Sequence, residues 1–112
     1  LFLQRIHEIP GGNTMLPAEQ NLIMHIALPI GKENILMGSD ILESQGQTLN
    51  AGNNFYISIS TESEEEALRI FSLLSVDGKI KMPMGKTFWG SYFGMFTDKF
   101  GIQWMVSYEY KV

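Results

Sequence analysis

Few residues of this 112-residue sequence are of the types that carry out chemistry. It has no cysteine, which excludes disulfides, thiolate nucleophiles and cysteine-ligated metals. The two histidines, His7 and His25, fall on expected strands and belong to no ligand-spaced pair such as H-x-H or H-E-x-x-H. A structural or surface role is the favoured interpretation for each. His25 is the better site candidate, because it lies on the face of its strand opposite the apolar one.

Two further motifs have ordinary explanations. Residues 85–87 (GKT) resemble the end of a phosphate-binding P-loop, but the glycine required five positions earlier is Ile80, and aromatic strand residues follow instead of a helix. The acidic run at residues 62–66 suits the first turn of a helix better than a metal site. No G-x-G-x-x-G precedes an expected helix, so a Rossmann fold for a dinucleotide or S-adenosylmethionine lacks support.

Composition narrows the class of protein. Hydrophobic residues make up 45% and aromatic residues 12% of the chain, which indicates a packed core in one domain. The net charge of −4, without a basic cluster, argues against nucleic acid or an anionic membrane surface as partner. No apolar run approaches the roughly 20 residues that cross a bilayer, and no signal-peptide pattern is present. We expect a cytoplasmic protein.

The elements that must position any site are several strands and one helix, which predicts the α+β class. Residues 54–60 alternate, with Phe55, Ile57 and Ile59 on one face and polar groups on the other. One helix is expected at residues 63–75, where a serine and a glutamate have capping-box spacing. Strands are expected at residues 1–8, 22–28, 35–39, 54–60, 79–84 and 102–110 and within the aromatic stretch, with a turn at residues 29–34.

That aromatic stretch, residues 85–106, alternates rings with glycines, as in strands whose rings line a surface. Residues 98–101 (DKFG) predict a hairpin turn, with Gly101 at positive φ. Trp89 and Trp104 are core residues by default, although the glycines leave room for one of them to line a pocket. The seven methionines predict adaptable packing, with a malleable ligand cavity as the alternative.

These residues resemble a known family. The segment TFWGSYFGMFTDKFGIQWMV, with KMPM before it and ILMGSD at residues 35–40, is similar to the PhnB-like branch of the vicinal oxygen chelate superfamily. That superfamily includes glyoxalase I, bleomycin-resistance proteins and extradiol dioxygenases, and PhnB-like members are often labelled demethylubiquinone methyltransferase-like. The resemblance covers residue 1 to about residue 108.

The resemblance implies paired βαβββ modules, the glyoxalase/bleomycin resistance/dioxygenase fold, with curled mixed sheets around a cavity and dimerisation. Within a single domain, residues 1–40 correspond to an incomplete first module, 41–53 to a linker and 54–112 to the second module. The resemblance also implies that the opening strand and helix of the first module should precede Leu1. They are absent from this sequence, either because they are cut away or because a partner contributes them.

The resemblance also implies where metal ligands would lie in metal-dependent relatives. By that pattern, Asn54 and Met105 fall at the two ligand places of the second module, and Met37 falls near one of the first. A neutral amide and two thioethers are poor ligands for Mg²⁺, Mn²⁺ or Fe²⁺ and weak ones for Zn²⁺. We therefore expect no metal and no cofactor. Nothing in the sequence resembles the cofactor site of a methyltransferase, so that label lacks support.

The favoured hypothesis is a metal-free protein that binds a small molecule in a cavity, as a homodimer. One alternative is an enzyme, a lyase, isomerase or oxidoreductase of the superfamily's kinds, with an atypical metal site or with His25 or Tyr56 as acid or base. Another is a dimeric structural or regulatory module. The residues expected to line the cavity are Asn54, Tyr56, Trp89, Met37, Met105 and His25.

Overall fold

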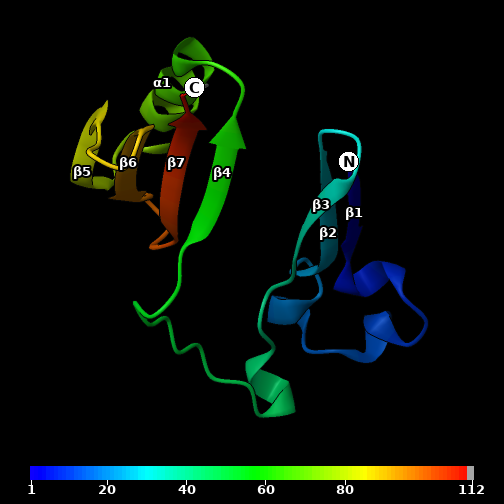
Figure 1. The fold of residues 1–112 in the computed structure, drawn as a ribbon. Helices are drawn as coiled ribbons and strands as arrows, with labels where there is room; N and C mark the ends of the chain where they lie inside the picture. Colours follow the sequence, from blue (N-terminus) through cyan, green and yellow to red (C-terminus); the bar gives the residue numbers. More distant parts are fainter. Residues whose placement is uncertain (111–112) are drawn as a thin grey trace. The chain divides into compact units, whose positions relative to one another are not determined.

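The computed structural model of the chain describes residues 1–110, which form two compact units divided between Asn50 and Ala51 (Figure 1). The first unit contains β1 (Phe2–Arg5), β2 (Ile23–Ile30), β3 (Asn34–Gly38) and four 3-10 turns, η1 (Ile6–Glu8), η2 (Gly12–Thr14), η3 (Pro17–Glu19) and η4 (Glu43–Gln45). The second contains β4 (Ile57–Thr61), α1 (Glu64–Leu74), β5 (Lys79–Lys86), β6 (Ser91–Thr97) and β7 (Gln103–Glu109). The predicted α+β class is confirmed, with two sheets and one α-helix in the described residues.

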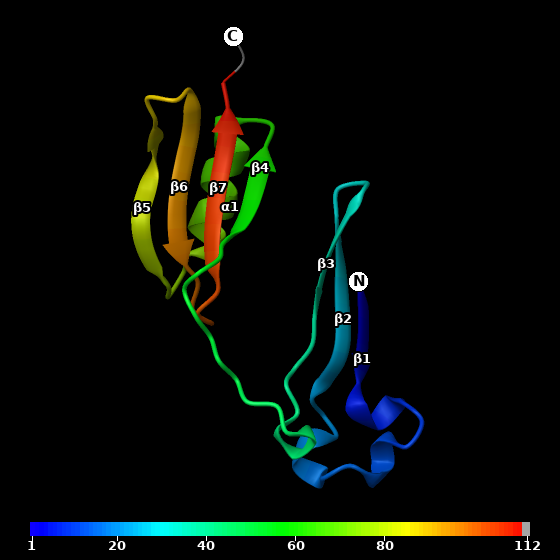
Figure 2. The ribbon, with the colours of Figure 1, turned by 60° about the horizontal axis from the view of Figure 1, so that its bottom comes forward.

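The first sheet is antiparallel, in the order β1-β2-β3 (Figure 2). Its register pairs Ala27 with Phe2 on one side and with Met37 on the other. The turn predicted at residues 29–34 is shorter than expected, because β2 continues to Ile30. Pro29 is tolerated there because β1 begins opposite Ala27, so that Pro29 has a strand neighbour only in β3.

Irregular turns make up the rest of the first unit. The strand expected at residues 1–8 ends at Arg5, where a 3-10 turn begins. Residues 41–53, expected as a linker, contain η4, which is joined to η3 by hydrogen bonds. Glu19 is buried, and its carboxylate accepts hydrogen bonds from the backbone N–H of Ser44 at 3.3 Å and from the Ser44 hydroxyl. The predicted separation into module, linker and module within one domain stays a prediction.

The second sheet has the order β4-β7-β6-β5, with β4 parallel to β7 and the other pairs antiparallel (Figure 2). The chain therefore forms the predicted βαβββ unit in its second half. The strand expected at residues 54–60 begins later, at Ile57, and the alternation within it holds. Ile57 and Ile59 pair with Trp104 and Val106, whereas Ser58 pairs with Met105 on the opposite face.

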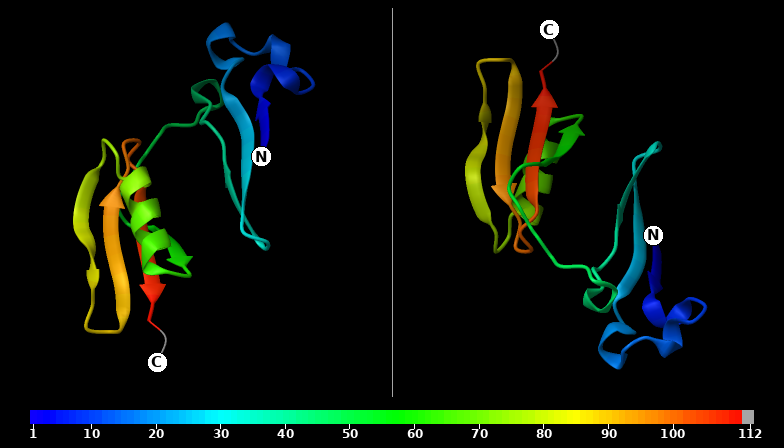
Figure 3. Two further views of the ribbon diagram at one scale, coloured as in Figure 1. Left: turned by 90° about the horizontal axis from the view of Figure 1, so that it is seen from above. Right: turned by 90° about the horizontal axis from the view of Figure 1, so that it is seen from below.

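Helix α1 lies across one face of this sheet (Figure 3). Its start is the predicted one, because Ser63 is the N-cap and its hydroxyl accepts a hydrogen bond from the N–H of Glu66 at 3.1 Å. The helix buries Ala67 and Phe71, and the Phe71 ring meets Phe96 edge to face with centroids 5.1 Å apart. The core of the unit is therefore the helix face of the sheet.

The turn between β6 and β7 forms around Asp98, as the DKFG pattern predicts. One carboxylate oxygen of Asp98 accepts hydrogen bonds from the N–H groups of Phe100 and Ile102, and the other accepts from the indole of Trp104 at 2.9 Å. Gly101 has φ of +90°. Trp104 is thus a core residue with a satisfied indole N–H. Within residues 1–110, no helix has the length and apolar character needed to cross a membrane.

Candidate functional site

The sheet face of the second unit that α1 does not cover carries most of the predicted site residues. We call it the helix-free face. The register places on it the side chains that alternate with the helix-facing ones, and many of them are half-buried or exposed. These residues are Ser58 and Ser60 of β4, Lys79 and Met82 of β5, Phe93, Met95 and Thr97 of β6, and Gln103, Met105 and Ser107 of β7. Lys81, at the register shift between Ile80 and Met82, reaches the face through its contact with Gln103.

A polar cluster of Tyr56, Lys81 and Gln103 lies at one end of this face. The Lys81 ammonium donates to Oε1 of Gln103 at 2.5 Å and to the hydroxyl of Tyr56 at 3.1 Å. It also lies 5.2 Å from the centre of the Tyr56 ring. Because β6 separates β5 from β7, the lysine side chain crosses a neighbouring strand to reach Gln103. The helix-free face is therefore charged at one end.

Gln103 fixes this cluster to the backbone. Its side chain is only 6% exposed, and its Nε2 group donates to the carbonyl oxygen of Phe55 at 2.7 Å. Both ends of the amide are therefore satisfied, as a buried amide requires. Because Phe55 directly precedes Tyr56, the same amide holds the segment that carries the tyrosine hydroxyl. Gln103 thus positions both other members of the cluster.

Apolar groups continue the face beyond the cluster. Met95 and Met105 are directly paired on neighbouring strands, and Phe93 follows along β6. Trp89, which is 53% exposed, contacts Phe93 edge to face with ring centroids 5.7 Å apart. A polar end beside thioethers and rings is the combination that small-molecule sites commonly present.

Of the six residues predicted to line a cavity, three lie on or beside the helix-free face. Met105 is on the face, Tyr56 is in the polar cluster, and Trp89 reaches the face through Phe93. Asn54 is exposed in the segment before β4.

The other two predicted residues belong to the first unit. His25 and Met37 share one face of its sheet, because Met37 is opposite Ala27, two residues along β2 from His25. The His25 ring lies near Phe2, with centroids 5.9 Å apart, and Met37 is 63% exposed. His25 therefore does lie on the predicted face of its strand, paired with Gln4 of β1 and beside the Phe2 ring.

The metal of the wider superfamily does not fit the side chains at the expected places. Asn54 offers a neutral amide, and Met37 and Met105 offer thioethers, which are not the carboxylate or imidazole ligands that these metals prefer. Within residues 1–110, no group of three or more histidine, aspartate or glutamate side chains is arranged to hold an ion. No metal-dependent step can be derived from these residues.

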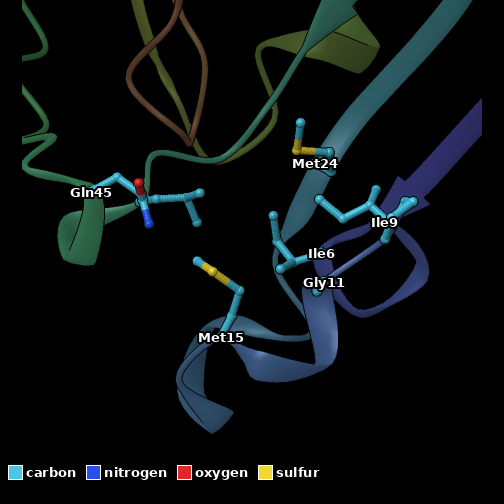
Figure 4. Close-up of a pocket in the computed structure, with 9 residues that line it drawn as sticks. Ile6, Ile9, Gly11, Met15, Met24 and Gln45 are labelled. Carbon is cyan, nitrogen blue, oxygen red and sulfur yellow. The ribbon is translucent and has the colours of Figure 1, made fainter.

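A small pocket in the first unit was not predicted. It has a volume of about 250 Å³, below the roughly 300–1,000 Å³ of most ligand sites. Figure 4 shows the side chains of Ile6, Met15, Met24 and Gln45 directed toward it from η1, the end of η2, β2 and η4. Its lining is mainly apolar. None of the six predicted residues lines this pocket.

Two residues of the polar cluster, Lys81 and Gln103, were also missed. Lys81 was noted only as part of the KMPM segment that supports the family resemblance. Gln103 is a polar residue in an otherwise apolar run after the DKFG turn, and such a residue in a central strand signals a buried hydrogen-bonded group. That signal could have identified Gln103, whereas the contact with Lys81 depends on pairing across three strands.

The sequence matches the family described as Glyoxalase/Bleomycin resistance protein/Dioxygenase superfamily over residues 5–106. A curated relative, Protein YjdN of Escherichia coli (strain K12), is 36% identical over 74 residues, which are 64% of this chain and 50% of the relative. The chain thus spans about half the length of that curated relative.

Two solved structures are similar to the chain over 96% of its length. Protein PA1353 from Pseudomonas aeruginosa is 38% identical with a TM-score of 0.77, and 78% of that chain is covered. A putative 3-demethylubiquinone-9 3-methyltransferase, PhnB protein, from Bacillus cereus is 23% identical with a TM-score of 0.71 and 77% coverage, which establishes likeness of fold alone. The resemblance inferred from the sequence is confirmed.

Proposed function

Because the chain belongs to the Glyoxalase/Bleomycin resistance protein/Dioxygenase superfamily, we propose that it binds a small molecule on the helix-free face of its second unit without a metal. The observation that carries the proposal is the composition of this face. A buried glutamine holds a lysine and a tyrosine at one end, and thioethers and rings continue the surface. The resemblance implies curled sheets around a cavity, and in our proposal such a cavity would enclose a ligand lying there.

The roles of the residues follow from their chemistry. Met95, Met105 and Phe93 supply apolar contact that adapts to ligand shape. The polar cluster fixes orientation, since a few well-placed polar groups in an apolar site give specificity. Trp89 would cover the outer part of the ligand, because its ring stands beside Phe93 and is half exposed. The missing carboxylate and imidazole ligands at the expected ligand places support a site without metal.

A homodimer is part of the proposal. Large apolar side chains are exposed on both faces of the first sheet, among them Phe2, Leu28 and Met37. Exposed apolar surface of this kind commonly marks an interaction site. Light scattering coupled to size-exclusion chromatography tests this part, with a mass of twice 12.7 kDa expected and a monomer at high concentration contradicting it.

A thermal-shift screen of the chelator-treated protein tests the binding site. Ser58 is exposed on the helix-free face beside Met105, so that Ser58→Arg would obstruct the face without disturbing the core. Leu68→Arg on the exposed side of α1 is the control. We expect compounds that stabilise the parent protein to lose their effect in Ser58→Arg and to keep it in Leu68→Arg.

The metal-free character is tested separately. Elemental analysis of protein purified without chelators is expected to give far less than one divalent ion per chain, and added Mn²⁺ or Zn²⁺ is expected to leave compound binding unchanged. Stoichiometric metal, or binding that depends on it, would favour a metalloenzyme and contradict the proposal.

A further inference from the structure

The Lys81 ammonium has donor capacity that its protein contacts do not use. An ammonium has three N–H donors. Its polar contacts among residues 1–110 are with two neutral groups, the Gln103 amide oxygen and the Tyr56 hydroxyl. One donor is therefore left for another group, and the positive charge is held without a carboxylate in these contacts.

Tyr56 provides a second donor beside the first. Its hydroxyl accepts from Lys81, and a hydroxyl that accepts one hydrogen bond still has its own hydrogen to donate. The two donor atoms are 3.1 Å apart. One oxyanion with two oxygen atoms can accept from both at once, and hydrogen bonds to ionised acceptors are roughly twice as strong as neutral ones.

The surroundings favour an anion at this place. Within the four strands of the sheet, Glu109 is the sole acidic residue. It lies at the other end of β7, about 20 Å from Gln103 at the usual rise per strand residue. The paired methionines Met95 and Met105 lie along the same face. Asp98 lies nearer, in the turn between β6 and β7, but both of its carboxylate oxygens already accept hydrogen bonds from N–H groups of the turn and of an indole. An anionic group would therefore meet two donors, one of them a cation, beside a carboxylate that other donors occupy.

We propose that Lys81 Nζ and the Tyr56 hydroxyl form a subsite for an oxyanion, a carboxylate or phosphonate carried by a ligand with an apolar body. Gln103 is a positioning residue, because it holds Lys81 by its oxygen and the backbone before Tyr56 by its nitrogen. This inference rests on the proposed function and adds to it the chemical class of the ligand.

The test compares benzoate with benzamide, which have nearly the same shape and differ in charge. Both are titrated into the full chain, and binding is followed by NMR at the Gln103 side-chain amide and the Met105 methyl group. We expect benzoate to bind about tenfold more tightly than benzamide, since a hydrogen bond to a charged group contributes roughly this factor. Phenylphosphonate, titrated in the same way, distinguishes the two kinds of oxyanion.

Matched variants assign the effect to the subsite. Lys81→Met keeps the aliphatic stem and removes the charge, and is expected to weaken benzoate binding about tenfold while leaving benzamide binding unchanged. Tyr56→Phe is expected to weaken benzoate binding several-fold. Lys79→Met is the control, because Lys79 is a second exposed lysine of β5, paired with Thr97 on the helix-free face. It is expected to leave the benzoate preference intact.

The outcomes separate this inference from the proposed function. If both compounds bind at the face with equal affinity, or if Lys79→Met and Lys81→Met have equal effects, the oxyanion subsite is wrong and small-molecule binding stands. If neither compound shifts the Gln103 or Met105 signals, the subsite is also refuted, and a negative compound screen would then refute the proposed function too.

Discussion

Lys81 and Gln103 are joined by a 2.5 Å hydrogen bond that crosses β6, from Nζ on β5 to Oε1 on β7. Neighbouring strands are spaced by about 4.8 Å, so that only a long side chain can reach a second strand along the sheet surface. Lysine has this reach, and the amide at the other end is held by the carbonyl of Phe55. The contact therefore links β5, β7 and the segment that enters β4.

Gln103→Leu removes both hydrogen bonds from this junction while keeping the side chain buried. We expect the free energy of unfolding to fall by about 1–3 kcal/mol, because the carbonyl of Phe55 loses its partner. Urea titration followed by circular dichroism measures the change, with Ser58→Ala on the same face as control. A loss no larger than that of Ser58→Ala would show that the Gln103 contacts contribute little.

Asp98→Ala should loosen the turn between β6 and β7. Three donors lose a charged acceptor, including the indole of Trp104, so we expect a loss of roughly 1.5–3 kcal/mol. Urea unfolding monitored by tryptophan fluorescence measures the loss. Asp77→Asn is the control, since Asp77 has φ of +60° and asparagine tolerates that conformation. Equal stability of the two variants would contradict the assigned role of Asp98.

Gly94→Ala tests the packing of α1 on the sheet. A Cβ atom there would lie 2.6 Å from the Met84 sulfur and 2.8 Å from a Phe71 ring carbon, which is too close without rearrangement. We expect a destabilisation of about 1–3 kcal/mol in chemical denaturation. Gly85→Ala in β5 is the matched control, because its Cβ would meet no atom nearer than 3.9 Å. If both variants were equally stable, the close contact of helix and sheet would be wrong.

Tyr110 should make stability sensitive to alkaline pH. Burial, together with the hydrogen bond that its hydroxyl donates to Glu64, raises the pKa of Tyr110 from 10.0 to about 12. Because the hydroxyl holds its proton more tightly in the folded than in the unfolded chain, it contributes stability that is fully present below pH 10. This contribution is lost as pH rises from about 10 to 12. We expect the stability advantage of the parent over Tyr110→Phe to shrink across that range.

Urea unfolding of both proteins between pH 8 and 12 measures this change. Tyr56→Phe serves as the comparison, because the Tyr56 hydroxyl accepts from a lysine and has no carboxylate partner in that contact. An advantage of the parent over Tyr110→Phe that stays constant through pH 12 would show that Tyr110 does not hold its proton in the folded state.

The sequence predicted the elements of the second unit better than their contacts. Alternation at residues 54–60 separated Ile57 and Ile59 from Ser58 correctly, because a half-buried strand requires that period. The cap at Ser63 and the turn at Asp98 were also predicted, since both depend on local hydrogen bonds. Such elements can be predicted from the sequence because the residues that form their hydrogen bonds are close along the chain.

The first unit and the polar cluster were harder to predict. The end of β1 at Arg5 and the extension of β2 through Pro29 depend on where the partner strands stop. The contact of Lys81 with Gln103 depends on strand order and reach. Such features come from long-range pairing, which a single sequence does not encode at any one position. The cytoplasmic location expected from composition stays a prediction.

The measurement that tests the central claim most directly is methionine-methyl NMR of the chelator-treated protein during a small-molecule screen. The seven methionines report separately on the possible sites. Met95 and Met105 lie on the helix-free face, Met84 lies near Phe71 on the helix side, and Met15 and Met24 line the pocket of the first unit. We predict that binding compounds shift the Met95 and Met105 signals and leave Met84 unchanged. Shifts confined to Met15 and Met24, or shifts that appear only after a divalent metal is added, would contradict the account.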